Sequence, residues 1–177
     1  MNAVESPFIR DATPDDVEGI QRLADRIWRA CYPGIISLEQ IDYMLGWMYS
    51  REKILAEMAG QQIRYLLVAP NANAEQLGFA AFGPGETSDE VMLHKLYIDP
   101  DHQRAGFGSA LLRSVFAQAE ISGADRVSLR VNRHNTTAIR AYQKNGFAVT
   151  AEDRADIGNG FVMDDFILTR HLSPGGS

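Results

Sequence analysis

The first third of the chain carries hydrophobic residues at helical spacing. Apolar side chains recur every three or four positions over residues 17–31, which predicts a helix with one buried face. The Thr-Pro-Asp-Asp segment at 13–16 is typical of a helix start, and Pro-Gly at 33–34 of a helix end. Two further helices are expected over 37–48 and 51–59. The side chains predicted to be buried on the first helix are Val17, Ile20, Ala24, Ile27 and Cys31.

The pattern changes near residue 63, where short apolar runs alternate with turn-forming residues. Such runs predict strands, and longer segments with helical spacing lie between the later ones. The elements expected in chain order are strands 63–69, 76–83 and 90–98, a helix 106–122, a strand 126–131, a helix 135–144, and strands 147–154 and 161–170. The last two strands flank Gly-Asn-Gly at 158–160, which predicts a hairpin. This order implies an α/β protein with a mixed sheet flanked by helices.

Length and composition are those of one globular domain. The chain has 177 residues, and we expect a single domain over 1–172 with a polar, flexible tail at 173–177. A net charge of −6 leaves no basic surface to hold a phosphate backbone, so no nucleic-acid partner is expected. The single cysteine excludes an internal disulfide, and no apolar run suggests a signal peptide or a membrane span. These features predict a cytoplasmic protein without a membrane partner.

The segment with the clearest chemistry is the one where a strand passes through a charged loop into a helix that begins with two glycines. Gly106 and Gly108 let backbone N–H groups converge at the positive end of the helix, which favours phosphate binding. Arg104 adds a positive charge. The segment is neither a P-loop, because Ser109 stands where Lys is needed, nor a dinucleotide fingerprint, because Leu111 stands where a small residue is needed. An ordinary helix start remains the alternative.

Two blocks resemble motifs of the GNAT superfamily of N-acetyltransferases. Gln-Arg-Ala-Gly-Phe-Gly at 103–108 matches its coenzyme signature, Gln/Arg-x-x-Gly-x-Gly/Ala, and 96–100 is similar to the strand before it. The block at 135–147 resembles the family's later motif, and 158–166 is similar to segments in bacterial members that act on small molecules. The resemblance implies the GNAT fold, with a twisted, mostly antiparallel sheet, and an acyltransferase (EC 2.3.1) that uses acetyl-coenzyme A as co-substrate.

The resemblance also implies where the coenzyme binds. The pyrophosphate would lie on backbone amides of the turn, and the pantetheine arm would pair with the preceding strand, where an amide would polarise the thioester carbonyl. The coenzyme-binding residues expected on this basis are Leu96, Tyr97, Ile98, Gln103, Arg104, Ala105, Gly106, Phe107, Gly108, Ser109, Asn135 and Tyr142.

The catalytic groups follow from the same resemblance and from general acid–base chemistry. Tyr142 is expected to protonate the leaving thiolate, and its alternative role is packing on a helix face. Glu90 and His94 share one side of a strand, so either could take the proton of the amine, as could water. The histidines show no metal-ligand spacing, and no metal is expected. Transfer is expected to be direct, so Cys31 need not take part and is expected to be a small buried hydrophobe.

The nature of the acceptor is indicated by charge and not by a motif. We expect a small cationic amine, because the chain is acidic and Glu86, Asp89 and Glu90 cluster before the central strand. Modification of protein N-termini or lysines is a second hypothesis, and a non-catalytic acetyl-coenzyme A sensor a third. Monomer and homodimer both stay open.

Overall fold

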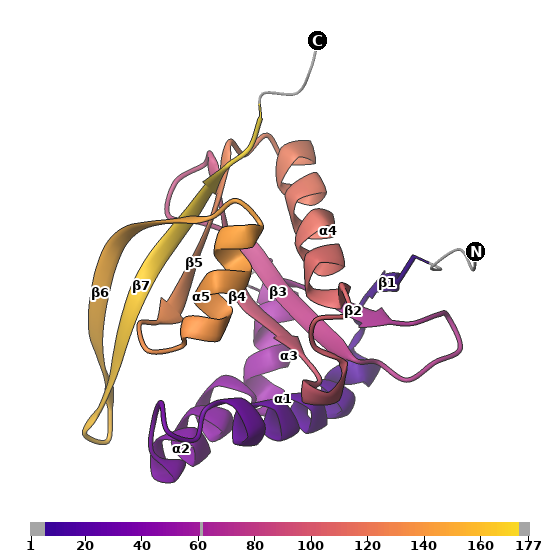
Figure 1. Ribbon diagram of the computed structural model, residues 1–177. Helices are drawn as coiled ribbons and strands as arrows, with labels where there is room; N and C mark the ends of the chain where they lie inside the picture. The colour runs from indigo at the N-terminus through magenta and orange to yellow at the C-terminus, as the bar shows by residue number, and fades with distance from the viewer. Residues whose placement is uncertain (1–5, 61, 174–177) are drawn as a thin grey trace. The chain divides into compact units, whose positions relative to one another are not determined.

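The computed structural model describes residues 6–60 and 62–173, in which strands and helices follow the expected order (Figure 1). The strands are β1 (Phe8–Asp11), β2 (Arg64–Ala69), β3 (Gly78–Pro84), β4 (Glu90–Ile98), β5 (Arg126–Asn132), β6 (Ala148–Gly158) and β7 (Phe161–His171). The helices are α1 (Val17–Cys31), α2 (Leu38–Met48), α3 (Arg51–Gly60), α4 (Phe107–Ile121) and α5 (Thr136–Lys144), with short 3-10 turns η1 (Pro14–Asp16) and η2 (Pro100–His102). All the expected helices and strands are present.

The strands form one mixed sheet in the order β1-β2-β3-β4-β5-β7-β6. The pairs β1–β2, β2–β3, β5–β7 and β6–β7 are antiparallel, and β4–β5 is parallel. The parallel ladder joins Glu90–Leu93 to Arg126–Leu129. The expected α/β class with a mostly antiparallel sheet is therefore confirmed.

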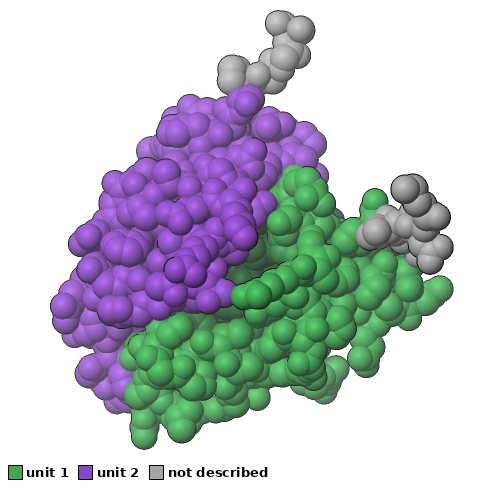
Figure 2. All heavy atoms as spheres, viewed as in Figure 1, with its two compact units in different colours: residues 1–83, 95–113 green, residues 84–94, 114–177 purple. Residues whose placement is uncertain are grey.

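The chain divides into two compact units, coloured separately in Figure 2. The first unit comprises residues 1–83 and 95–113, and the second 84–94 and 114–177. Both β4 and α4 contribute residues to each unit. A single domain over 1–172 stays a prediction, and most of the expected tail, residues 174–177, lies outside the described residues.

The core of the first unit is built on the apolar face of α1. Val17, Ile20, Ala24 and Ile27 are buried as expected. Cys31 is only half-buried, so its expected burial was wrong. Trp28 completes the face instead, 1% exposed, with its ring stacked on Tyr32 at 4.4 Å between centroids. Helical spacing favours burial of Cys31 over burial of Trp28, yet the larger indole side chain of Trp28 reaches the core.

The second unit is dominated by the β6–β7 hairpin. Each strand has eleven residues, and β6 runs four residues beyond the expected end at 154. Most of β6 is exposed, as expected for an edge strand, so no buried face produces the alternation that would reveal its length. Gly158, Asn159 and Gly160 have φ angles of 90°, 55° and 78°, which confirms the tight turn. On one side of this sheet the Arg170 guanidinium lies 4.0 Å from the ring centre of Phe116 in α4.

Candidate active site

The second half of β4 holds Leu96, Tyr97 and Ile98 in the first unit, directly against a glycine of β3. A Cβ on Gly78 would lie 2.5 Å from the carbonyl oxygen of Tyr97 and 2.5 Å from Cδ1 of Ile98. No side chain fits there, so the two backbones approach closely. Sequence reasoning missed this role, although a lone glycine inside a strand pattern is its usual signal.

The loop after β4 is held to α1 by a partly buried ion pair. Asp99 is 6% exposed, and its Oδ2 lies 3.0 Å from Nε of Arg26. Its Oδ1 accepts a hydrogen bond from the backbone N–H of Asp101 at 2.9 Å, and Arg26 also pairs with the Asp101 carboxylate at 2.7 Å. These contacts fix the path of the chain into the glycine turn. Their partners are more than 70 residues apart, so no local sequence pattern indicates them.

The glycine turn itself is exposed and free of side-chain obstruction. Arg104 and Gly106 have φ angles of 64° and 89°, and α4 begins at Phe107, one residue later than expected. A Cβ on Gly106 would have nothing within 4 Å, and one on Gly108 would lie 3.7 Å from Cγ1 of Ile98. The backbone is thus open at the start of a helix, where its first N–H groups lack helical partners. This arrangement suits an anionic ligand.

Gln103 connects the turn to its surroundings. Its Nε2 donates to the carbonyl oxygen of Ile98 at 3.3 Å and lies 3.6 Å from Sγ of Cys31. The first unit therefore brings β4, the turn and the end of α1 together around this side chain. Of the expected coenzyme contacts, 96–98 and 103–109 all lie in this unit.

A buried polar triad lies beside the same stretch of β4. Lys95 donates from Nζ to Glu57 of α3 at 2.9 Å and to the Tyr65 hydroxyl of β2 at 2.5 Å, and that hydroxyl also donates to Glu57. Lys95 is 4% exposed. Burial lowers the pKa of Lys95 despite the opposing effect of Glu57, and burial with the Glu57 hydrogen bond raises that of Tyr65. The triad ties α3 and β2 to β4.

Helix α5 of the second unit carries Asn135 and Tyr142 at opposite ends. The Asn135 side chain accepts from the backbone N–H of Ala138 at 3.2 Å and so caps the start of the helix. Tyr142 is half-buried, and its ring meets that of Phe147 edge-on, with centroids 5.6 Å apart. The structure shows the ring packing, and the expected proton donation by Tyr142 stays a prediction.

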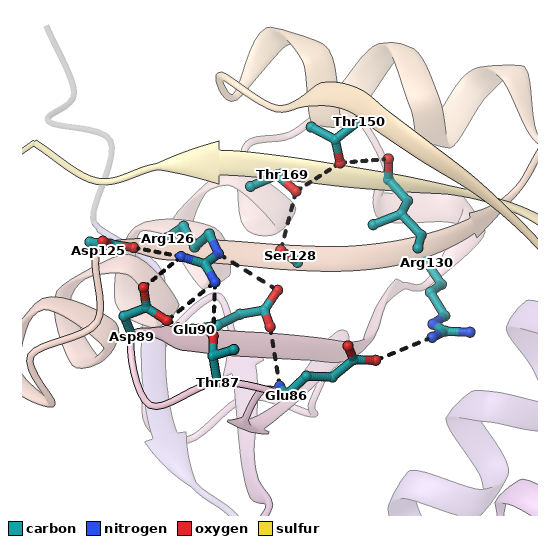
Figure 3. A network of polar contacts seen from close by, with 11 residues as sticks. Glu86, Thr87, Asp89, Glu90, Asp125, Arg126, Ser128, Arg130, Thr150 and Thr169 are labelled. Atoms are coloured by element: carbon teal, nitrogen blue, oxygen red, sulfur yellow. Dashed lines mark hydrogen bonds and ion pairs between the residues drawn. The ribbon is translucent and has the colours of Figure 1, made fainter.

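The candidate bases Glu90 and His94 differ in their surroundings, although both lie on β4 in the second unit. The Glu90 side chain is 12% exposed, accepts from the backbone N–H of Glu86 at 3.1 Å and lies 4.0 Å from Nε of Arg126. His94 is exposed. Figure 3 shows the Glu90 carboxylate within the polar network around Arg126.

Arg126 also neutralises part of the acidic cluster that was expected to attract a cation. Its guanidinium donates to Asp89 at 2.8 Å and to the Thr87 hydroxyl at 2.8 Å (Figure 3). Hydrogen bonds from Thr87 and then from Arg126 lower the pKa of Asp89 to about 2. Asp89 and Glu90 thus join the starts of β4 and β5 through Arg126. The attraction of a cationic acceptor by this cluster stays a prediction.

Within residues 6–60 and 62–173, no three His, Cys, Asp or Glu side chains gather as metal ligands. No helix in the described part of the chain has the length and apolar character needed to span a bilayer.

Comparison with known proteins tests the reading of the two blocks. The model of the acetyltransferase (GNAT) family matches residues 24–147. A spermidine N(1)-acetyltransferase of Thermoplasma acidophilum is 28% identical over 158 residues, 88% of this chain and 94% of its own. A [ribosomal protein bS18]-alanine N-acetyltransferase of Escherichia coli is 32% identical over 115 residues, 65% of this chain and 73% of its own.

A solved structure extends the similarity to the fold. The PaiA N-acetyltransferase of Thermoplasma acidophilum, crystallised in complex with coenzyme A, has a TM-score of 0.78 and 26% identity, covering 94% of this chain and 99% of its own. The family match includes both the glycine turn and α5, and thus both blocks that carried the resemblance. The chain belongs to the acetyltransferase (GNAT) family and is an N-acetyltransferase.

Proposed function

We propose that this enzyme transfers the acetyl group of acetyl-coenzyme A to a primary amine of a small cationic acceptor. The observation that carries the donor half is the exposed turn at 103–109, where a φ of 89° at Gly106 and the missing side chain of Gly108 leave the backbone N–H groups open. A pyrophosphate fits such a turn at the start of a helix, and Arg104 adds charge there. The relative crystallised with coenzyme A supports the same donor.

The pantetheine arm would extend along the second half of β4. The ladder to β5 covers Glu90–Leu93, so the backbone of 96–98 lies beyond it. An extended arm can hydrogen-bond to such a strand as an added strand does. Gly78 keeps the other edge of β4 close to β3, which holds Tyr97 and Ile98 in place. A backbone N–H in this stretch would stabilise the oxyanion of the tetrahedral intermediate.

The reaction would proceed by direct attack in a ternary complex. The neutral amine nitrogen forms a bond to the thioester carbon, and the carbonyl oxygen takes up the negative charge. When the oxyanion collapses, the carbon–sulfur bond breaks and the thiolate leaves. Tyr142 would donate its hydroxyl proton to this thiolate, because a phenol with a pKa of about 10 holds its proton at neutral pH until the thiolate forms beside it. The nitrogen, now bonded to the acetyl carbon, loses its extra proton to solvent, and the Tyr142 phenolate regains a proton from solvent.

The acceptor must lose a proton before it attacks. Glu90 and His94 remain the candidate bases, with water as the alternative. Glu90 is already engaged with the Glu86 backbone and lies close to Arg126, while His94 is exposed. Replacing each in turn separates them, since loss of the true base should lower the rate most at low pH, where the amine is protonated.

The choice of a small cationic acceptor draws on the relatives. The spermidine N(1)-acetyltransferase matches over nearly its whole length and over 88% of this chain. The bS18-alanine enzyme has higher identity, 32%, over a shorter stretch, which supports a protein N-terminus as second candidate. We favour the small amine because the longer alignment includes more of the chain outside the coenzyme motifs.

The test is thiol release from acetyl-coenzyme A with a panel of acceptors. Spermidine, 1,5-diaminopentane and a peptide that begins with alanine represent the two candidates, and calorimetry measures coenzyme binding separately. We expect fastest release with a diamine or polyamine. A preference for the peptide would replace the first candidate by the second. Coenzyme binding without thiol release from any acceptor would identify a sensor and reject the proposed transfer.

A further inference from the structure

Three strands of the second unit place polar residues in one row. Strand register sets Asp165 of β7 opposite Asn132 of β5 on one side and Asp153 of β6 on the other. Directly opposed residues in antiparallel strands point to the same face of a sheet, so these three side chains are neighbours. Asp164, the next residue along β7, points to the opposite face, where it accepts from Nε of Arg133 at 2.8 Å.

Asp165 is a buried residue, and its carboxyl group has no direct partner in the described part of the chain. Asp165 is 4% exposed. In the described part of the chain, neither a hydrogen bond nor an ion pair within 4.0 Å reaches this carboxyl group. Burial of a charged group without a partner is unfavourable, and most proteins avoid it. A carboxyl kept in this position therefore calls for a ligand that pairs with it.

The cation nearest to this row is Arg130 of β5, and it is already engaged. Its guanidinium pairs with Asp153 and lies 3.9 Å from the carboxylate of Glu86. Strand β7 lies between β5 and β6, so the Arg130 side chain must cross β7 to reach Asp153. One guanidinium thus serves the carboxylates of Glu86, Asp153 and, at longer range, Asp165. Among the described residues, no second cation pairs with Asp153 or Asp165.

The pKa of Asp165 is consistent with a carboxyl group that has no positive charge paired with it. Burial is the main cause that raises the pKa of Asp165 to about 6, and the charges of Asp153 and Asp164 raise it further, while Arg130 opposes them. At neutral pH the group is therefore mostly ionised, and it lies beside other carboxylates without a direct partner.

We propose that this face of β5, β7 and β6 binds an ammonium group of the acceptor, with Asp165 as its main ligand. An alkylammonium has three N–H donors, which match the carboxylates of Asp165 and Asp153 and the side-chain oxygen of Asn132, which also accepts from the backbone N–H of His134 at 2.9 Å. The inference rests on the proposed function, since it assigns the cation of that acceptor to residues that no motif contains. It also supplies negative charge in addition to the acidic cluster around Asp89, part of which Arg126 neutralises.

The first experiment measures binding without turnover. The full-length protein is titrated with 1,5-diaminopentane in a calorimeter at pH 7, and with neutral 1,5-pentanediol as the ligand control. Asp165→Asn keeps the shape and removes the charge, and Asp164→Asn is the matched control, with the same change in charge one residue away on the other face. We expect binding to weaken about 10- to 100-fold in the first variant and less than about threefold in the second.

The second experiment uses the proton that ammonium binding should displace. Below pH 6 most Asp165 carboxyls are protonated, so pairing with a cation must release that proton. Titrations at pH 5.5 in buffers of different ionisation enthalpy should show release of roughly 0.8 proton per bound diamine in the wild type. Asp165→Asn should show no such release.

Equal diamine affinity in the wild type and Asp165→Asn would overturn the inference, as would the absence of binding to the wild type. Because Asp165→Asn removes a buried charge that has no partner, the melting temperature of this variant should not fall. Asp153→Asn is an independent second variant, and we expect it to bind the diamine more weakly as well. A measurement of thiol release distinguishes failure of the Asp165 site from failure of the proposed function. A wild type that acetylates the diamine with the same KM as Asp165→Asn refutes this site alone, whereas no release with any amine refutes the proposed function.

Discussion

Removal of the Lys95 ammonium from the triad with Glu57 and Tyr65 should lower the free energy of unfolding, and the contacts that Glu57 keeps determine by how much. Lys95→Met keeps the length of the side chain and leaves the Glu57 carboxylate without its 2.9 Å partner. Loss of one member of a buried ion pair typically destabilises a protein by about 3–5 kcal/mol, because the other charge stays buried. Here the carboxylate keeps the Tyr65 hydroxyl and a distant Lys53 at 3.8 Å. We therefore expect the lower end, about 3 kcal/mol.

Urea denaturation followed by circular dichroism measures this loss as a shift in midpoint at constant slope. For a chain of this size, about 3 kcal/mol corresponds to a fall in melting temperature of roughly 6–12 °C. Lys53→Met is the matched control: the same substitution near the same carboxylate, but on a partly exposed side chain, where less than about 0.5 kcal/mol is expected.

The double variant Lys95→Met with Glu57→Gln isolates the interaction between the two charges. With the carboxylate neutralised, most of the loss should be recovered, so the double variant should be more stable than Lys95→Met alone. The reasoning is refuted if Lys95→Met lies within about 1 kcal/mol of the wild type, or if neutralising Glu57 adds to the loss in place of reversing it.

Three further predictions concern the site. Tyr142→Phe should lower turnover by roughly 10²–10⁴-fold with little change in coenzyme affinity, and rapid-quench kinetics that find more than about a third of the wild-type chemical rate would leave Tyr142 a packing residue only. Gly108→Leu should fold normally, since a Cβ there meets only Ile98 at 3.7 Å. Its affinity for acetyl-coenzyme A, measured by calorimetry, should fall at least about tenfold, and unchanged affinity would show that the turn does not bind the coenzyme. The pKa of Asp165 is about 6 in the folded state and 3.8 in the unfolded state, so the folded state binds the proton more tightly. The free energy of unfolding should therefore fall as pH rises from about 4 to 6. Denaturation of Asp165→Asn at the same pH values should not show this fall.

Local patterns determined much of the fold because the apolar residues of this chain repeat at clear periods. The helices and most strand bounds follow from spacing, and the glycine turn follows from the need for open backbone near phosphate. The length of β6 did not follow, since an exposed edge strand has no buried face to produce alternation. Trp28 in place of Cys31 shows a related limit: spacing defines a face, while side-chain size decides which residue at its margin is buried.

The parts of the site that sequence reasoning missed depend on contacts between distant segments. Arg26 meets Asp99 from 73 residues away, and Glu57 meets Lys95 from 38 residues away. Each residue alone looks like an ordinary surface charge, and only the fold makes it a partner. Asp165 shows the same limit, because alternation along β7 does not say which face its side chain takes. Only the register with Asp153 shows which neighbours it has.

The contact between Gln103 and the chain's one thiol has a practical consequence for enzymology. Cys31 is the single cysteine of the chain, half-buried, with its sulfur 3.6 Å from Nε2 of Gln103. A thiol reagent that detects released coenzyme A can therefore react with the protein at most once, a fixed background that a blank without acceptor subtracts. The same sulfur can be labelled without mutagenesis. Its alkylation rate, compared with and without coenzyme, reports on how accessible the sulfur is beside the glycine turn.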